Sequence, residues 1–463
     1  MKKILFILFV FMFLFSCEYK GCNNEIVEFT HNGILTYYVD ENPKEALKKI
    51  KLKILKNNKE NVLSLDHQDI KVEKFSFDKI GDFTAIVKYK NKSYSLKYKV
   101  EVRKWDGKTD TAWYDSSIDS YEISTAKQLA GLAELVNQGN DFSGKLIKLK
   151  YDIDLNNHPW IPIGTNGVGV FSEVNKYFSG NFDGGNHTIY NLYTKANHQS
   201  MGEHLDHETS YYHFGLFGYI KNNTIKNLTI QGVNIINGMG NNYTRSLQGT
   251  AALVGYTSGN VLIENVKIMG DIKIKGEYKV GGIVGSSGGE SIKVINSCVR
   301  GKENSLISGT DEEYKDTNNF GGLIGFTATS KTTLENVISN INVDGYTSGG
   351  LIGNVTEGTL NIENACVYGN ISNKEGSVVG GFVGGRFVSM TLSNCYMVGK
   401  VSSKEIDYAD VCVSLYGDKS ESIKINDVYF NSDNYDSEKI NNSLNITGKT
   451  KEELDQLIKD DLK

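Results

Sequence analysis

A short glycine-rich phrase recurs through the second half of the chain and limits the possible folds more than any other feature. It joins two glycines, two apolar residues and a third glycine. Copies begin at Val280, Phe320, Ser348 and Val379, and looser copies begin at Phe214 and Ala251. An Asn follows the last glycine of each copy after 9 to 11 residues. A motif repeated this often is more typical of architecture than of chemistry.

The Asn residues place the copies in register with one another. They are Asn227, Asn265, Asn296, Asn336, Asn364, Asn394 and Asn426, with Asn191 as an earlier member. An apolar residue stands two positions before each of them except the last, where Lys424 interrupts the column. The copies recur about every 30 residues, and within each copy apolar and polar residues alternate as they do in strands. One such repeat cannot bury its own apolar face. The pattern therefore predicts a β-solenoid in which the copies stack.

The glycines and the Asn residues each have a structural explanation. Stacked strands lie about 4.8 Å apart, so a corner of the stack can be too tight for any residue but Gly. Gly also adopts positive φ without steric cost, and Asn tolerates the same backbone conformation. Stacked Asn side chains can hydrogen-bond to one another as a ladder. We therefore expect both columns to be structural rather than catalytic.

The glycine phrases resemble a known repeat family. "FGLFGYI", "GGIVG", "GGLIG" and "GGFVG" are similar to the GLUG motif of bacterial surface and secreted proteins. Residues 121–193 resemble the usual lead-in to such repeats, with "YEISTAKQLAGLAELVNQG", "YDIDL", "WIPIG" and "FSGNFDGGNHTIYNL". The resemblance implies a right-handed parallel β-helix, here over residues 141–435, and an extracellular adhesive or host-facing role. It implies no particular ligand.

The last copy and the tail after it differ from the rest. "VSLYGDKSESIKINDVYFN" lacks the double glycine, which suits a terminal coil. In the tail, residues 436–463, Thr450 and Glu453 have the spacing of a capping box. We expect them to start a short polar helix that shields the edge of the final coil.

In residues 25–104 apolar and polar residues alternate with a period of two, and this pattern predicts a small β-sandwich. In "SYSLKYKVEVR" and "DFTAIVKYK" the apolar residues share one face, and residues 91–92 form a short hairpin connection between the two runs. Residues 79–89 resemble the late hairpin of bacterial Ig-like domains, which implies an Ig-like sandwich that acts as a spacer. The chain is therefore expected to be all-β, with this sandwich before the β-helix.

A linker and a capping helix are expected over residues 105–140. Thr125 and Gln128 form a capping box, apolar residues after them recur with helical spacing, and Gly139 ends the pattern. Such a helix before a repeat array is the expected terminal cap.

The first seventeen residues have the pattern of an export signal. Two lysines precede twelve apolar residues, which span about 18 Å as a helix and fall short of a ~30 Å hydrocarbon core. "LFSC" resembles the bacterial lipobox, which implies a signal peptide over residues 1–16, an acyl chain on Cys17 and a tether over residues 17–24. We then expect a monomer in the bacterial cell envelope, lipid-anchored at the outer membrane or cell surface. The net charge of −5 gives no indication of a nucleic-acid partner.

The six cysteines are scattered rather than clustered as in a disulfide framework. Cys298 and Cys366 share one column, but a repeat with Ile338 lies between them, and two strand spacings exceed the ~7 Å limit between disulfide Cα atoms. Cys366 and Cys395 lie on adjacent repeats one column apart, so their side chains should point to opposite faces. We predict no disulfide among the repeat cysteines.

No catalytic constellation can be read from the sequence. GLUG repeats also occur in IgA-cleaving metalloproteases, yet Tyr211 stands where the second His of H-E-x-x-H would follow His207 and Glu208. His204, His207 and His213 are still candidates for a metal site, with a solvated polar insertion as the alternative. The sequence therefore predicts that the protein is not an enzyme and has no cofactor.

Two functions from different classes remain open. The first is a binding or adhesion protein for an extracellular glycan or a host protein. The second is a surface enzyme that degrades polysaccharides, as some right-handed β-helices do, with Asp152, Asp154 and Asp183 as candidates for acid–base or calcium chemistry. The same Asp residues also suit turns, and no basic strand column accompanies them, so the pattern favours binding.

Length variation among the repeats indicates where a ligand would bind. Long stretches precede three glycine phrases, at residues 194–213, 233–250 and 302–319, and they should project from one side of the solenoid. They supply aromatic contact groups and acidic residues. The binding-face candidates are Tyr211, Tyr212, Tyr243, Tyr314, Asp311, Glu312 and Glu313. The alternative is that these loops vary in length because the core does not constrain them.

Overall fold

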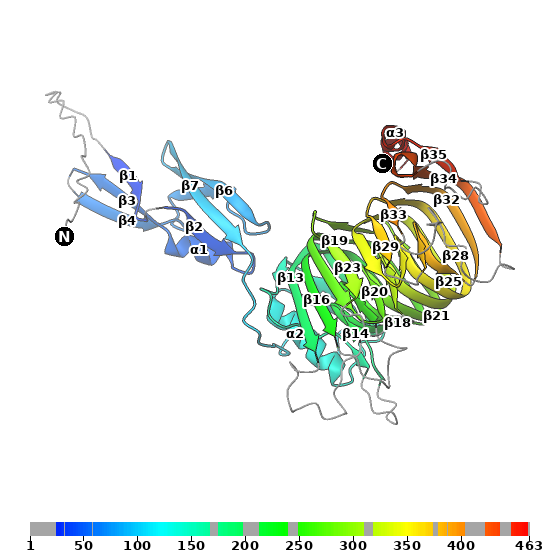
Figure 1. Cartoon of the computed structure of the whole chain (residues 1–463). Helices are drawn as coiled ribbons and strands as arrows, with labels where there is room; N and C mark the ends of the chain where they lie inside the picture. The colour runs from blue at the N-terminus through cyan, green and yellow to red at the C-terminus, as the bar shows by residue number, and fades with distance from the viewer. Residues whose placement is uncertain are drawn as a thin grey trace, which may run out of the picture. The chain divides into compact units, whose positions relative to one another are not determined.

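The structure is a computed structural model of the chain (Figure 1). It describes residues 25–31, 33–57, 59–166, 175–197, 213–238, 249–309, 318–373, 378–386, 388–402, 422–435 and 446–461. The chain divides into two compact units, Met1–Glu101 and Val102–Lys463. Strands dominate the described part of both units, so the expectation of an all-β chain is confirmed. No helix in this part is long and apolar enough to cross a membrane.

The first unit contains two sheets, with strand orders β1-β3-β4 and β2-β7-β6-β5. The strands are β1 Ile26–Phe29, β2 Leu35–Tyr38, β3 Lys51–Lys56, β4 Lys59–Ser64, β5 Ile70–Glu73, β6 Gly81–Tyr89 and β7 Lys92–Glu101. The alternation expected in β6 and β7 is confirmed, because Val87, Leu96 and Tyr98 are buried. Their turn lies one residue earlier than expected, since Tyr89 pairs with Lys92. A short helix that the sequence analysis missed, α1 (Pro43–Lys49), follows β2.

The second unit is built almost entirely from parallel strands. The strands of its larger sheet are β8 Ser120–Ile123, β9 Leu146–Leu149, β10 Ile153–Asp154, β13 Asn181–Asn197, β15 Phe217–Lys221, β16 Thr224–Gly238, β18 Val254–Ser258, β19 Asn260–Gly276, β21 Val284–Ile295, β22 Cys298–Gly301, β23 Leu306–Gly309, β25 Ile324–Asn340, β26 Asn342–Gly345, β28 Ile352–Val367, β29 Ile371–Asn373, β31 Val383–Arg386, β32 Ser389–Met397, β33 Val401–Ser402, β34 Ile423–Asn431 and β35 Thr447–Lys449. A second sheet contains β14 His213–Phe214, β17 Gly249–Ala251, β20 Lys279–Gly281, β24 Asn319–Gly321, β27 Thr347–Gly349 and β30 Val379–Gly380.

Each repeat of this unit pairs with the next one along the chain. β13 pairs with β16, β16 with β19, and β25 with β28, all in parallel, and Figure 1 shows the strands stacked in chain order from β13 to β34. Among the described pairings of the unit, only β11 (Thr165–Asn166) with β12 (Asn175–Lys176) is antiparallel. One continuous apolar core runs inside the stack. We call this stack of repeats the ladder.

The glycine phrases mark places where backbones approach too closely for a side chain. A Cβ atom on Gly281 would lie 2.0 Å from the carbonyl oxygen of Val284, and one on Gly322 would lie 2.0 Å from that of Gly350. None of the glycines in these phrases has positive φ, so the expectation that they are needed for a left-handed backbone is wrong. Crowding alone therefore explains the repeated phrase.

The Asn column forms the expected ladder of side-chain hydrogen bonds. The Asn265 amide donates to Asn227 at 3.0 Å, and three further bonds of 2.8–3.0 Å link Asn296 through Asn336 and Asn364 to Asn394. All six have positive φ between +51° and +54°. The interpretation of this column as structural is thus supported by both its backbone and its side chains.

The two ends of the Asn column were assigned incorrectly. Asn191 lies between residues that pair with Gln231 and Val233, so it faces the Gly232 position rather than Asn227. At the other end Asp427, with φ +52°, takes the place expected for Asn426. The terminal repeats lack a complete glycine phrase, so nothing in the sequence sets their register.

Helices lie at both ends of the second unit. α2 (Ala126–Asn137) begins at Thr125, whose hydroxyl accepts a bond from the Gln128 backbone N–H, as the capping box predicts. α3 (Lys451–Asp461) begins with the reciprocal bonds of Thr450 and Glu453. Only the placement of α3 differs from the expectation. It packs on the side of the ladder, against Cys366, Tyr396 and Val398, instead of on its final edge.

The three described repeat cysteines are free, as predicted, and the fourth, Cys412, lies outside the described residues. Cys298 pairs with Ile338, which pairs in turn with Cys366, so a full repeat separates the two thiols. Cys366 belongs to the cluster under α3, whereas Cys395 belongs to the main core, so the two point to opposite faces of the strand layer.

Candidate binding site

Most residues singled out from the sequence lie outside the described part of the chain. They are Cys17, His204, His207, Tyr211, Tyr212, Tyr243, Tyr314, Asp311, Glu312 and Glu313. The strands that follow the three long stretches are described. β14, β17 and β24 lie in one six-stranded sheet, so the C-terminal ends of the three stretches are near one another along it.

His213, the third metal candidate, is buried in the ladder. Its Nδ1 accepts a hydrogen bond from the Gly249 backbone N–H at 3.2 Å, and its ring stacks on Tyr256 with centroids 5.0 Å apart. Burial, with the nearby Lys279 charge as a smaller cause, lowers its pKa to about 3. Among the described residues no three His, Cys, Asp or Glu side chains gather in a way that could hold a metal ion.

The three Asp candidates for acid–base chemistry take part in local structure. Asp152 accepts from the Thr188 backbone N–H at 2.8 Å. Asp154 accepts from Asn191 at 2.8 Å. Asp183 accepts from Asn227 at 3.1 Å and so extends the Asn ladder by one residue. The described contacts favour the interpretation of these residues as parts of turns and of the Asn hydrogen-bond column.

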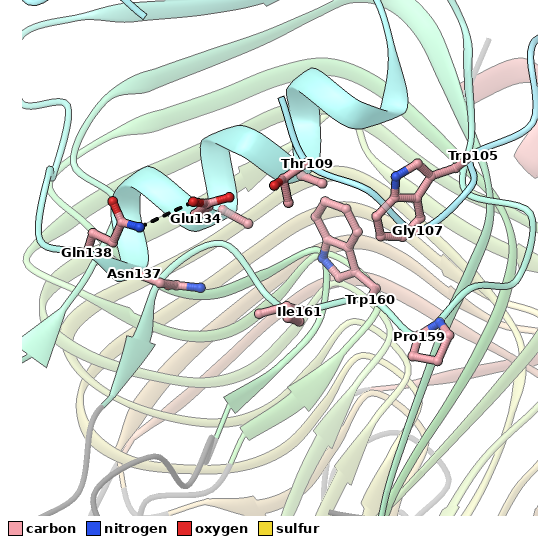
Figure 2. Close-up of a pocket in the computed structure, with 11 residues that line it drawn as sticks. Trp105, Gly107, Thr109, Glu134, Asn137, Gln138, Pro159, Trp160 and Ile161 are labelled. Carbon is pink, nitrogen blue, oxygen red and sulfur yellow. Dashed lines mark hydrogen bonds between the residues drawn. The ribbon is translucent and has the colours of Figure 1, made fainter. Parts of the chain in front are cut away.

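A pocket at α2 was not predicted from the sequence. Its cavity volume is about 300 Å³. It is lined by Trp105, Gly107, Thr109, Ala130, Ala133, Glu134, Asn137, Gln138, Pro159, Trp160 and Ile161. Figure 2 shows Glu134, Asn137 and Gln138 along the helix and the two indole rings on the other side. We call this cavity the α2 pocket.

The indole walls of the α2 pocket are locked by hydrogen bonds. The Trp105 Nε1–H donates to the Lys108 carbonyl at 2.7 Å, and the Trp160 Nε1–H donates to the Leu216 carbonyl at 3.0 Å. The two rings meet edge to face with centroids 5.7 Å apart. Both polar edges are already paired, and the rings are almost fully buried, with 6% of Trp105 and 3% of Trp160 exposed, so only a small apolar part of each ring faces the pocket.

The helix side of the α2 pocket carries the polar groups. Asn137 is bonded at both ends of its side-chain amide, since one N–H donates to the Pro162 carbonyl and its carbonyl accepts from the Gly164 backbone N–H, both at 3.0 Å. Gln138 donates to the Glu134 carboxylate at 3.3 Å (Figure 2). The arrangement combines apolar walls with a few converging polar groups, which is typical of small-molecule sites.

The sequence held one indication of this pocket. All three tryptophans, at positions 105, 113 and 160, fall in the short segment around the capping helix. Their clustering in sequence did not reveal that two of them face α2, because that depends on how the segments at 105–109 and 159–161 pack.

Comparisons with known proteins gave only distant structural similarity. No protein-family model matches the chain, and no curated protein does. A solved structure described as a "putative immunoglobulin A1 protease" from Bacteroides ovatus has 18% identity and a TM-score of 0.46, with 73% of this chain and 86% of that chain covered. Another, named "IgA1 Protease", has 16% identity and a TM-score of 0.48. That match covers 90% of this chain but 29% of the other, so this chain spans under a third of it.

These names correct the expectation that the protein is not an enzyme. Solved structures that it resembles bear the name of a protease, so that expectation is wrong as stated. The absence of H-E-x-x-H was too narrow a reason, because catalytic groups brought together from distant strands leave no local motif. At this level of similarity the protease activity remains a property of those proteins and does not transfer to this chain.

Proposed function

We propose that this chain is a lipid-anchored bacterial envelope protein that binds a ligand outside the membrane. In this proposal the first unit is an Ig-like spacer and the second is a right-handed parallel β-helix. The parallel pairing of successive repeats and the Asn ladder support the second assignment. The antiparallel pairing of β6 with β7 supports the first.

The α2 pocket is the observation that carries ligand binding. It is a preformed cavity with apolar walls and a limited set of polar groups, and its walls are held by hydrogen bonds to the rest of the unit. Such a cavity is the usual form of a small-ligand site. The loops at residues 194–213, 233–250 and 302–319 remain the proposed surface for a larger partner.

The anchor is tested by replacing Cys17 with Ser. If Cys17 is acylated, the wild-type chain should label with radioactive palmitate and partition with membranes, whereas C17S should be unlabelled and soluble. A matched control is Cys22→Ser, which removes a thiol five residues away and should leave the label in place. Labelling of C17S would exclude this residue as the anchor.

Ligand binding is tested with the chain from residue 18 onward, which keeps every described residue. It should bind glycans or extracellular matrix proteins displayed on an array, and it should bind fewer of them after thermal unfolding. An array on which the folded chain binds nothing would contradict the proposed binding function.

A further inference from the structure

The walls of the α2 pocket are fixed to the ladder before any ligand arrives. The Trp160 backbone N–H donates to the Tyr193 carbonyl at 2.9 Å, and its carbonyl accepts from the Thr194 hydroxyl at 3.0 Å. The Trp105 backbone N–H donates to the Asp154 carbonyl at 3.0 Å. With the indole bonds, these contacts leave the aromatic wall little freedom to lose on binding.

The charge of the α2 pocket disfavours anionic ligands. Among the described residues that line it, Glu134 is the one charged residue, and the nearby Lys127 is paired with Asp106 at 2.9 Å. The Glu134 side chain is half-buried, so its negative charge is less screened than one in bulk water. A phosphate, sulfate or carboxylate group would therefore be repelled.

The open hydrogen-bonding groups favour a ligand with hydroxyls. The Glu134 carboxylate and the Gln138 carbonyl can only accept, the Thr109 hydroxyl can accept and donate, and the remaining Gln138 N–H can only donate. A hydroxyl both donates and accepts, so it can use all of these groups. An ammonium ion only donates, so it would leave the donors of the pocket unused.

Hydroxyls on one edge and an apolar face are the combination that a sugar ring presents. We propose that the α2 pocket binds a neutral sugar residue of an extracellular glycan. The apolar C–H face of the ring packs on Pro159 and Ile161 and on the small accessible part of the two indole rings, and its hydroxyls bond to Glu134, Gln138 and Thr109. This inference rests on the proposed binding function and specifies its ligand.

Tryptophan fluorescence gives a direct readout, because two of the three tryptophans of the chain line the pocket. The chain from residue 18 onward is titrated with maltopentaose, cellopentaose, mannopentaose and chitopentaose, and with methylammonium chloride as a cationic probe whose N–H groups can only donate. We expect a saturable fluorescence change with at least one oligosaccharide at Kd below about 1 mM. Absence of binding to all four, or binding of methylammonium alone, would overturn the proposal.

Two variants connect that binding to the pocket. Glu134→Gln keeps the size of the side chain and removes its charge, so affinity should fall about tenfold or more. Gln138→Ala should weaken binding by a smaller factor. The control is Glu357→Gln, an exposed Glu on β28, which should bind like the wild type. Circular dichroism verifies that all three variants fold.

The same variants separate this inference from the proposed function. If Glu134→Gln binds the oligosaccharide as tightly as the wild type does, the α2 pocket is not the sugar site, although a binding protein remains. If the wild-type chain binds no oligosaccharide in solution and nothing on the array, both the inference and the proposed function fail.

Discussion

The helices α2 and α3, at the two ends of the second unit, pack differently against the stack of repeats. In α2 the buried residues are Ala126, Leu129, Ala130, Gly131, Leu132, Ala133 and Val136, and all of them except Gly131 belong to the continuous core. In α3 only Leu454 and Ile458 are buried among the residues with described side chains, and they belong to a separate small cluster. A capping box starts both helices, so the capping signal alone does not tell which one becomes part of the core.

The difference has a physical basis in composition. α2 has a broad apolar face and contains Gly131, where a Cβ would lie 2.0 Å from the Asp110 carbonyl oxygen. α3 carries acidic and basic residues around a narrow apolar stripe. The first helix packs closely and, with the segments at residues 105–109 and 159–161, lines a pocket. The second covers an apolar patch on one side of the ladder.

The largest effect is expected from truncation of the α2 core. Leu132 is fully buried, so Leu132→Ala should lower the free energy of unfolding of the second unit by about 2–5 kcal/mol. Urea unfolding followed by circular dichroism measures the loss. A loss below 1 kcal/mol would show that α2 is not an integral part of the core.

The buried His213, in β14, should make the stability of the second unit sensitive to acid. The His213 pKa is lowered to about 3 by burial and by Lys279, whereas an unfolded imidazole has a pKa of about 6.5. Between pH 3 and pH 6.5 the imidazole is protonated in the unfolded chain but not in the folded chain. The contribution of neutral, buried His213 to folding stability is therefore fully present above pH 6.5 and is lost as the pH falls toward 3. The loss should be about 1.4 kcal/mol per pH unit.

His213→Phe tests this, because it keeps an aromatic ring against Tyr256 and removes the titrating group. Between pH 6.5 and 4.5 the stability of the variant should depend less steeply on pH than that of the wild type, by the equivalent of one proton. Equal slopes would mean that the pKa of His213 in the folded chain is close to that of an unfolded imidazole.

A smaller and more local effect is expected at α3. Burial raises the pKa of the Cys366 thiol to about 12, so a maleimide should label it slowly at pH 8. Leu454→Ala weakens the contact of α3 with the side of the ladder, so Cys366 should label faster while most of the unit stays folded. Cys395 in the main core is the internal control. Peptide mass spectrometry identifies which thiol reacts, and simultaneous labelling of both would indicate that α3 is coupled to the whole core.

The smallest effect on stability is expected at the long loops. Shortening residues 302–319 to the length of the tight neighbouring repeats should leave the urea midpoint unchanged and weaken attachment to the natural surface. Equal adhesion of the shortened and full-length chains would exclude this loop as the binding surface and leave the α2 pocket as the proposed site.

The sequence predicted the parts of this structure that are repeated. Asn336 and Asn364 could be placed because several copies of their environment exist, and the expected amide bonds are present. Asn191 and Asn426 were misplaced because terminal repeats lack the full phrase. The α2 pocket was missed because its walls come from three separate segments, and the contact of Trp160 with α2 is tertiary. Repetition thus reveals register, whereas a single site formed once leaves no pattern.

Hydrogen exchange of the chain with and without its tightest-binding oligosaccharide tests most directly whether the α2 end is the ligand-binding end. Binding at the α2 pocket should slow exchange of backbone amides in α2 and at residues 159–161, and should leave α3 unchanged, because ligand contacts stabilise the closed state of the amides they cover. Protection of α3, or of neither helix, in a chain saturated with the oligosaccharide would contradict the account.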